Sequence, residues 1–306
     1  MFPIIPANSI TAVARTQKAI FGYGYTGSYV SMTNLVSSSG VVADDTTGVG
    51  TARWGLGAAA YGGDKVIFAY GWTSGGTYGA VSSLSNLVSN TGVVADDTAG
   101  VGTARRVLGA AGYGEDKAIF GYGGDAGNYL SMSNLVSNSG VVASDVTGVG
   151  TARQAMTAAG YGGDKAIFGH GEPDTAITNL VSNIGVVADD TAGVGTARHG
   201  LAAAGYGEDK AIFGYGYQNA GSYVSLTNLV SNTGVVADDT AGVGTARTYP
   251  AAAAYGGDKA IFGYGWTGSY VSMTNLVSNV GVVADDTTGV GTDRRALAAA
   301  GYSLSA

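Results

Sequence analysis

Residues 195–243 read GTARHGLAAAGYGEDKAIFGYGYQNAGSYVSLTNLVSNTGVVADDTAGV, and near copies of this unit fill the chain. The copies align on the lysine that opens each KAIF-like segment: Lys18, Lys65, Lys117, Lys165, Lys210 and Lys259. The intervals between these lysines are 47, 52, 48, 45 and 49 residues. Repeats of this length are typical of the blades of a β-propeller, in which each blade packs only against its neighbours.

Other landmarks keep fixed distances within each repeat. The asparagine of the NLVS segment, such as Asn34, stands 11 residues before an aspartate, such as Asp45. That aspartate always stands eight residues before an arginine, such as Arg53. Only the interval from lysine to asparagine varies, over 16, 21, 17, 14, 18 and 16 residues. All length variation therefore falls in one loop per repeat.

The segments within a unit predict short strands rather than helices. AAAGYG and KAIFGYG are short runs bounded by glycine, and NLVSNTGVVA is β-branched around a turn. The 53 glycines and the lack of a 3.6-residue apolar period disfavour helix. We therefore predict one all-β domain over residues 1–306, a six-bladed β-propeller with four antiparallel strands per blade. A β-solenoid is the main alternative, although its coils are usually shorter than 48 residues.

The repeat arithmetic also predicts how the ring closes. The stretch from Lys18 to residue 305 contains 288 residues, which is six times 48. The segment RALAAAGY, residues 295–302, should then supply the first strand of the blade that continues at Lys18, which removes an open sheet edge. Residues 1–17 are partly redundant with it, because ITAVA at residues 10–14 aligns with the same position. We favour the C-terminal segment, whose sequence matches the other repeats better.

Composition excludes several classes of protein. The 306-residue chain has no cysteine, so neither a disulfide scaffold nor a cysteine-ligated metal site is available. A net charge of −7 argues against a nucleic-acid partner. No run approaches 18 apolar residues and the N-terminus lacks the features of a signal peptide, so we expect no membrane partner. We expect a monomer and assign no localisation, although association with a virion is one setting for such repeats.

The order of arginine, small-residue strand, GGDK, AIFGYG and variable loop resembles the kelch motif in all six repeats. GYG, as at residues 22–24, stands where kelch repeats have GG, and the late kelch tryptophan is absent. The resemblance implies a propeller whose usual work is binding, although fold alone does not decide function. The near-identity of NLVSN and GVGTAR between repeats also resembles repeat proteins of bacteriophages or their bacterial hosts, or a design made from one.

Two sets of variable positions should share one face of this fold. The variable loop and the residues that follow each arginine project to the same side of a four-stranded meander, while the GGDK and SNTG turns project to the other. Aromatic, amide and charged side chains on a rigid scaffold suit a carbohydrate or a protein surface. The candidate ligand-binding residues are Tyr25, Trp54, Trp72, Arg106, Asp125, Gln154, Glu172, Asp174, His199, Tyr217, Tyr249, Trp266 and Arg295. Drift is the competing interpretation, because loops also change without function.

The repeated aspartates and arginines are predicted to form structural ion pairs, within one blade or between neighbours. They are Asp45, Arg53, Asp97, Arg105, Asp145, Arg153, Asp190, Arg198, Asp239, Arg247, Asp286 and Arg294. Calcium is the alternative for doubled acids such as Asp44 with Asp45. The third repeat, however, has Ser144 with Asp145, and the spacing is not that of an EF-hand. We therefore expect no metal.

Catalysis has little support in the sequence. His170 and His199 are the only histidines, and each is unique to its repeat. We therefore predict a non-enzymatic binding propeller without a cofactor, whose partner is a carbohydrate or a protein surface. A purely structural repeat module or scaffold is the alternative, in a virion, on a cell surface or as an engineered product. An enzyme of unknown type comes third.

Overall fold

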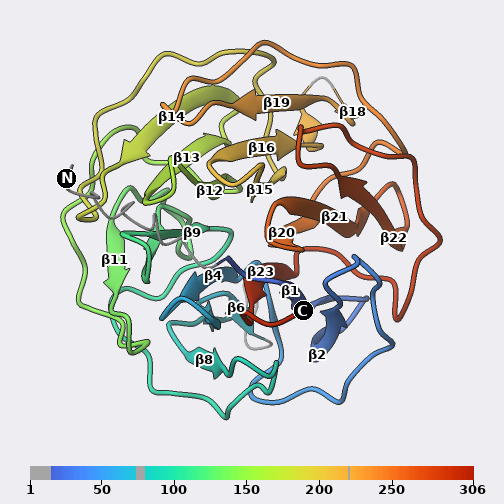
Figure 1. The fold of residues 1–306 in the computed structure, drawn as a ribbon. Coiled ribbons are helices and arrows are strands. Elements are labelled where there is room, and N and C mark those ends of the chain that lie inside the picture. Colours follow the sequence, from blue (N-terminus) through green and yellow to red (C-terminus); the bar gives the residue numbers. More distant parts are fainter. Residues whose placement is uncertain (1–14, 74–79, 220) are drawn as a thin grey trace, which may run out of the picture.

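The AAAGYG, KAIF and NLV segments form the three main strands of every repeat. The computed structural model describes residues 15–73, 80–219 and 221–306. Strands are the only extended regular structure there, and six three-stranded antiparallel sheets follow one another around a common centre in sequence order (Figure 1). The first sheet consists of β23 (Ala298–Tyr302), β1 (Lys18–Tyr25) and β2 (Tyr29–Val36), and the second of β4 (Gly57–Tyr61), β5 (Lys65–Ala69) and β8 (Ser85–Val88). The third consists of β9 (Gly109–Tyr113), β10 (Lys117–Gly121) and β11 (Ser133–Val136), and the fourth of β12 (Thr157–Tyr161), β13 (Lys165–Gly171) and β14 (Thr175–Val181). The fifth consists of β15 (Ala202–Tyr206), β16 (Lys210–Gly214) and β19 (Thr227–Val230), and the sixth of β20 (Ala251–Tyr255), β21 (Lys259–Trp266) and β22 (Tyr270–Val277).

Short strands extend two of the variable loops. The strands β3 (Arg53–Trp54), β6 (Trp72–Thr73) and β7 (Ala80–Val81) form a separate small three-stranded sheet. The strands β17 (Tyr217–Gln218) and β18 (Ser222–Tyr223) form a hairpin after β16. Both additions fall where the lysine-to-asparagine interval is longest, so inserted residues lengthen a hairpin and leave the main sheets unchanged.

The first sheet joins the two ends of the described chain. Strand β23 pairs with β1 from Lys18 opposite Tyr302 to Gly22 opposite Ala298. This is the pairing that the repeats predict for residues 295–302. The competing segment at residues 10–14 lies outside the described residues. The pairing therefore gives the Lys18 sheet the same three-strand order as the other five.

The fourth strand of each unit differs from the prediction. The segment after each NLVS turn makes isolated bridges to the third strand instead of a continuous ladder, as between Val36 and Val42 and between Thr33 and Thr46. The acidic pair between these bridges explains the break, because Asp44 is exposed and Asp45 turns its carboxylate to side-chain and amide donors. Each repeat therefore consists of a three-stranded sheet and a bridged outer segment.

Both faces of each main sheet are buried. Six apolar clusters occur among the described residues, and each cluster joins two neighbouring sheets. One cluster contains Phe68 of β5 with Ile20 of β1, and the next contains Ile67 of β5 with Phe120 of β10. Burial on both faces explains why the strands are continuously apolar rather than alternating.

Two cycles of main-chain hydrogen bonds run around the centre. In the first, the residue two positions after each repeated arginine donates its N–H to the equivalent carbonyl of the neighbouring sheet, over 2.5–3.0 Å. Its members are Gly55, Val107, Ala155, Gly200, Tyr249 and Ala296. In the second, the residue after each AAAGY-type strand donates to the residue before the next repeat's lysine, as from Gly62 to Asp116 at 2.7 Å. Each cycle returns to its first sheet, so the neighbour contacts are closed.

Every member of the first cycle has a positive φ, including Val107 at 46° and Tyr249 at 51°. This conformation is rare for β-branched and bulky residues and costs of order 1–3 kcal/mol unless the surroundings impose it. The hydrogen bonds on both sides impose it here. The innermost backbone is therefore held by its neighbours and not by local preference.

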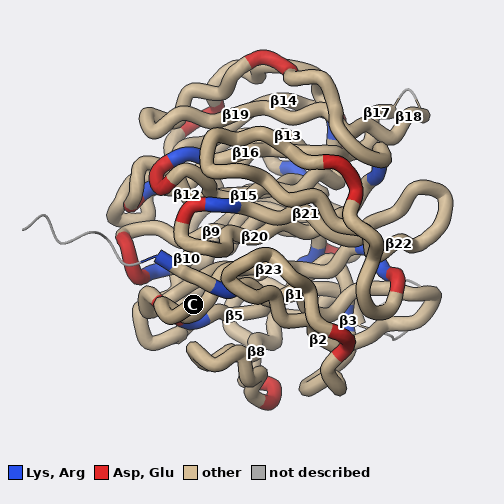
Figure 2. The backbone as a smooth tube through the Cα atoms, turned by 45° about the vertical axis from the view of Figure 1, so that its right-hand side comes forward, with Lys and Arg blue, Asp and Glu red and all other residues tan. Residues whose placement is uncertain are grey.

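Charged residues occupy only short stretches of the backbone, mostly at turns (Figure 2). This distribution follows from the 12% charged content and the burial of both sheet faces. Nothing in the described residues is a helix long and apolar enough to cross a membrane.

The C-terminal strand should contribute strongly to stability. Ala300 in β23 is 7% exposed and lies opposite Ile20. We expect Ala300→Asp to lower the free energy of unfolding by about 3 kcal/mol or more, because it buries an unpaired charge. Urea denaturation measures this change, and Ala306→Asp at the exposed end is the matched control. Equal stability of the two variants would show that β23 is not needed for the fold.

Candidate functional site

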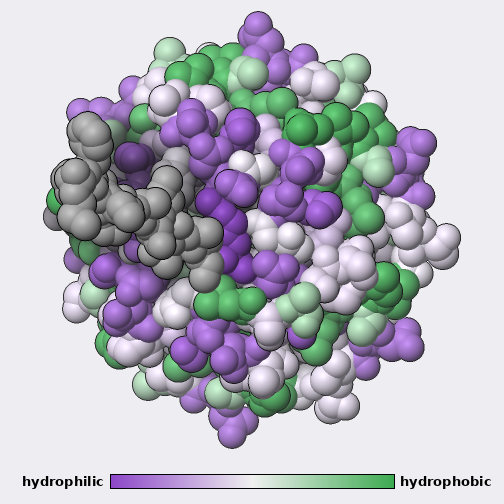
Figure 3. All heavy atoms as spheres, viewed as in Figure 1, coloured by the Kyte–Doolittle hydropathy of each residue, from purple (hydrophilic) through white to green (hydrophobic). Residues whose placement is uncertain are grey.

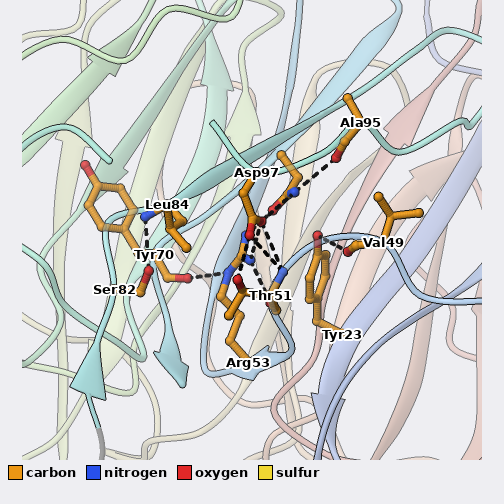
Figure 4. Close-up of polar contacts among 10 residues, drawn as sticks. Tyr23, Val49, Thr51, Arg53, Tyr70, Ser82, Leu84, Ala95 and Asp97 are labelled. Carbon is orange, nitrogen blue, oxygen red and sulfur yellow. Dashed lines mark hydrogen bonds and ion pairs between the residues drawn. The ribbon is translucent and has the colours of Figure 1, made fainter. Parts of the chain in front are cut away.

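One buried arginine per repeat organises the structure beneath the variable face. Arg53 donates from Nε to the Tyr70 carbonyl at 2.8 Å and from Nη1 to the Thr51 carbonyl at 3.0 Å. Its Nη2 donates to Asn86 Oδ1 at 2.5 Å, and Nη1 lies 3.6 Å from Asp97 Oδ1 (Figure 4). We call this set the arginine network. It recurs in each sheet, but the Nε atoms of Arg105 and Arg247 have no hydrogen-bond partner among the described residues.

The aspartate of the network is held from several sides. Asp97 accepts from Asn86 Nδ2 at 2.9 Å and from the Thr51 hydroxyl at 2.6 Å. Burial raises the pKa of Asp97, but the hydrogen bonds from Thr51 and Asn86 and the Arg53 charge outweigh it, so the net pKa is lowered. Gly50 has φ +71°, and a Cβ there would meet Asp97 Oδ1 at 2.5 Å. Both the conformation and the space therefore require glycine.

A tyrosine connects five of the six networks to the preceding sheet. The Tyr23 hydroxyl donates to the Val49 carbonyl at 3.2 Å, and the Arg53 guanidinium lies 4.5 Å from the centre of the Tyr23 ring. Burial raises the pKa of Tyr23 to about 12, so the hydroxyl stays protonated and keeps its donor role. Tyrosine and arginine thus alternate around the centre.

The ion pairs join the arginine of one repeat to the aspartate of the next, inside one sheet. They are Arg53 with Asp97, Arg105 with Asp145, Arg153 with Asp190, Arg198 with Asp239, Arg247 with Asp286 and Arg294 with Asp45. Their N–O distances are 3.6–4.0 Å. The aspartate eight residues before an arginine is therefore not its partner, and Arg294 bonds across the sheet that joins the chain ends.

His170 interrupts the alternation, because it stands where the other repeats have tyrosine. It is fully buried, and neither ring nitrogen has a hydrogen-bond partner among the described residues. Burial, aided by the Arg198 charge, lowers its pKa to about 3. Arg198 consequently lacks the stacked ring of the other five networks, and burial lowers its pKa to about 10. Histidine at this position therefore leaves Arg198 without a stacked tyrosine ring and leaves two buried ring nitrogens without partners among the described residues.

The residue after each network arginine lies opposite the residue after each GYG-type turn. Six cross-strand pairs result, and we call them together the variable mouth. The pairs are Arg295 with Tyr25, Trp54 with Trp72, Arg106 with Gly124, Gln154 with Glu172, His199 with Tyr217, and Thr248 with Trp266. Because the pairs occupy equivalent places in six consecutive sheets, they surround one end of the central axis.

Aromatic rings contact one another along much of the mouth. Trp54 and Trp72 are stacked, with centroids 5.6 Å apart and planes 12° apart. Tyr25 lies 6.5 Å from Trp54 and 6.0 Å from Tyr270, which in turn lies 4.7 Å from Trp266. Trp266 Nε1 donates to the Tyr223 hydroxyl at 3.0 Å, which extends the series to the next loop.

Two arginines lie on these rings. The Arg106 guanidinium is 3.8 Å from the centre of Trp72 and 5.6 Å from that of Trp54. The Arg295 guanidinium is 4.7 Å from the centre of Trp266. Stacking of a guanidinium face on an aromatic ring leaves the N–H groups at its edge for other partners.

The other side of the mouth carries the carboxylates. Gln154 Nε2 donates to Glu172 Oε2 at 2.8 Å. His199 Nδ1 lies 2.5 Å from Asp174 Oδ1, and the N–H of Asn219 also donates to Asp174. The mouth is therefore divided into an arginine-aromatic part and a carboxylate-amide part.

Tyr249 lies between these parts. It is the one aromatic member of the inner hydrogen-bond cycle, and its ring packs near Gly200. Burial first, and then the Glu172 charge, raise the pKa of Tyr249 to about 12, against the opposing charges of Arg106 and Arg295. Beneath it is a cavity of about 100 Å³, lined by small and apolar residues from all six sheets, including Leu108, Met156 and Leu297.

The opposite end of the axis is chemically different. A second cavity, of about 220 Å³, is lined there by repeated lysines that include Lys117 and Lys165. Lys117 and Lys165 each lie 3.0–3.1 Å from the aspartate that precedes them. This end is nearly invariant between repeats, and the four lysines that line its cavity are each paired with the preceding aspartate.

The structure brings twelve of the thirteen candidate ligand-binding residues to the variable mouth or its immediate border. Asp125 is the exception, because its carboxylate accepts from the N–H groups of Gly127 and Asn128 and closes its own loop. Four tyrosines were not predicted: Tyr29, Tyr129, Tyr223 and Tyr270. Each of them stands directly before a VSM-type segment, and this recurrence in the sequence could have identified them.

Comparison with protein-family models finds no match, and comparison with curated proteins finds none either. The class that the geometry itself defines is an all-β repeat protein of small antiparallel sheets.

Restoring the missing tyrosine should stabilise the protein. We expect His170→Tyr to raise the free energy of unfolding by about 1–2 kcal/mol, through a hydroxyl bond to the Val194 carbonyl and a ring beneath Arg198. His170→Phe is the control, since it restores the ring without the hydroxyl and should gain less. Urea denaturation at pH 7 measures both, and a less stable Tyr variant would contradict the prediction.

The same site predicts a pH dependence. The folded pKa of His170, about 3, lies below its unfolded value of about 6.5, so the unfolded chain binds more protons between these values. Stability is therefore lost as pH falls below about 6.5. From pH 7 to pH 5 we expect the wild type to lose about 2 kcal/mol more than His170→Tyr. Parallel pH profiles of the two proteins would be incompatible with a buried neutral histidine.

Proposed function

We propose that the chain is a six-bladed, kelch-like β-propeller closed by its C-terminal strand. Three observations support this proposal. The inner hydrogen bonds return to their starting sheet, the six apolar clusters each join neighbouring sheets, and β23 pairs with β1. Radial repetition of this kind leaves only short, protected sheet edges, which limits pairing with other chains.

We further propose that this propeller is a binding protein, not an enzyme, and that its variable mouth binds carbohydrate. The observation that carries the proposal is the connected aromatic series of Trp54, Trp72, Tyr25, Tyr270 and Trp266. Aromatic faces suit the apolar C–H faces of sugar rings, while convergent polar groups fix orientation. Gln154, Glu172 and Asp174 provide amide and carboxylate groups for hydroxyls on the other side of the mouth.

The mouth is also well suited to hold its shape. Each of its pairs begins one residue after a network arginine that is fully buried. Side chains in such a setting lose little conformational freedom on binding, which favours affinity. A flat protein partner is less well matched, because the polar groups converge around one axis.

A structural repeat module is the second candidate, and a different observation favours it. One valine in each outer segment is exposed at an equivalent place: Val41, Val93, Val141, Val186, Val235 and Val282. Such a series could contact neighbours in an assembly. On the face viewed in Figure 3, however, hydrophobic residues form separate patches among hydrophilic ones.

A glycan binding screen distinguishes the two candidates. We expect the intact chain to bind at least one glycan and the double variant Trp54→Ala with Trp266→Ala to lose about tenfold or more in affinity. Val93→Ala with Val141→Ala is the matched control and should bind normally. Absence of glycan binding, together with assembly that the valine variant abolishes, would favour the structural module.

A further inference from the structure

We propose that the saccharide bound at the variable mouth carries a carboxylate and that Arg106 binds this group. This inference rests on the proposed carbohydrate function and deepens it. Arg106, Trp72 and Trp54 carry the argument, with Arg295 on the far side of Tyr25 as a second cation.

The arginines of the chain have separate roles. Six of the nine form the arginine networks, and Arg15 donates to the Glu208 carbonyl. Two are left, Arg106 and Arg295, and both lie at the variable mouth. Neither side chain makes a hydrogen bond or ion pair with any residue that the structure describes, although each stacks on tryptophan. In a chain of net charge −7, two unpaired cations at one site point to an anionic ligand.

Arg106 is the better placed of the two. Its guanidinium lies over two tryptophan rings, 3.8 Å from the centre of Trp72 and 5.6 Å from that of Trp54, whereas the Arg295 guanidinium lies 4.7 Å from Trp266 and 5.9 Å from Tyr270. A carboxylate suits a guanidinium fixed by stacking, because its two oxygens match the parallel N–H groups at the edge.

The surroundings favour a single carboxylate over a polyanion. Arg106 lies within the electrostatic influence of Glu172, which Gln154 holds in place. The Glu172 charge reduces the net positive charge of this side of the mouth and disfavours a densely charged ligand. A sugar ring on Trp54 or Tyr25 can therefore present one carboxylate to Arg106 and its hydroxyls to the amide-carboxylate part.

The test uses oligosaccharides that contain uronic acids, each paired with its carboxyl-reduced counterpart. Reduction removes the charge and keeps the sugar ring, and isothermal titration calorimetry on the full chain measures both affinities. We expect at least one acidic form to bind about ten- to hundredfold more tightly than its reduced form. Arg106→Gln should abolish the difference and keep the weaker binding of the reduced form. Higher salt should weaken only the acidic form.

Lys117→Gln is the matched control, since it removes one positive charge at the opposite end of the axis and should keep the difference. A thermal melt of each variant verifies folding, and Arg106→Lys, which keeps charge without the fork of donors, should be intermediate. Equal affinity for acidic and reduced forms would overturn the inference and leave the carbohydrate function intact, as would binding of neutral glycans only. Failure of every glycan to bind would overturn both.

Discussion

A buried guanidinium is tolerated when its charge is paired and most of its N–H donors are bonded, and this requirement determines most of the repeat. Arg53 needs the Thr51 and Tyr70 carbonyls, Asn86 and Asp97 at once. Those partners come from three stretches of chain that meet only when the sheet has its full set of strands. The geometry of the arginine network therefore explains the fixed distances between asparagine, aspartate and arginine in the sequence. The variable loop after Tyr70 and its equivalents contributes none of these partners and is free to vary.

This constraint also explains why diversity gathers at one end of the axis. Trp54 follows Arg53 directly, so the network fixes the backbone from which the variable side chain projects. The residue can change without loss of the network because its own side chain makes none of those bonds. At the opposite end, the Asp–Lys turns supply carbonyls to the second hydrogen-bond cycle, as Asp116 does for Gly62. Changes there would disturb contacts between neighbouring sheets.

Much of the fold could be predicted from the sequence, because alignment of the six repeats separates constant positions from variable ones. The strand segments, the pairing of residues 295–302 with the Lys18 strand and the shared face of Trp54 and Trp72 all follow from alignment of the six units. The ion-pair partner of Arg53 could not be predicted, because the constant interval between Asp45 and Arg53 in the sequence does not show which aspartate lies near Arg53 in space. The bridged outer segment was also missed, because β-branched residues suggested a strand where Asp45 instead needs its donors.

Tyr249 shows how the inner ring and the mouth depend on each other. Its backbone belongs to the inner hydrogen-bond cycle, where most other repeats place glycine or alanine and one places valine. Its phenol lies where the charges of Arg106, Arg295 and Glu172 all act. Tyr249 also lines the apolar cavity, together with residues from all six sheets. The hydrogen bonds of Tyr249 to Gly200 and Ala296 hold its positive φ, so the bonds that join neighbouring sheets also fix the backbone that carries this side chain.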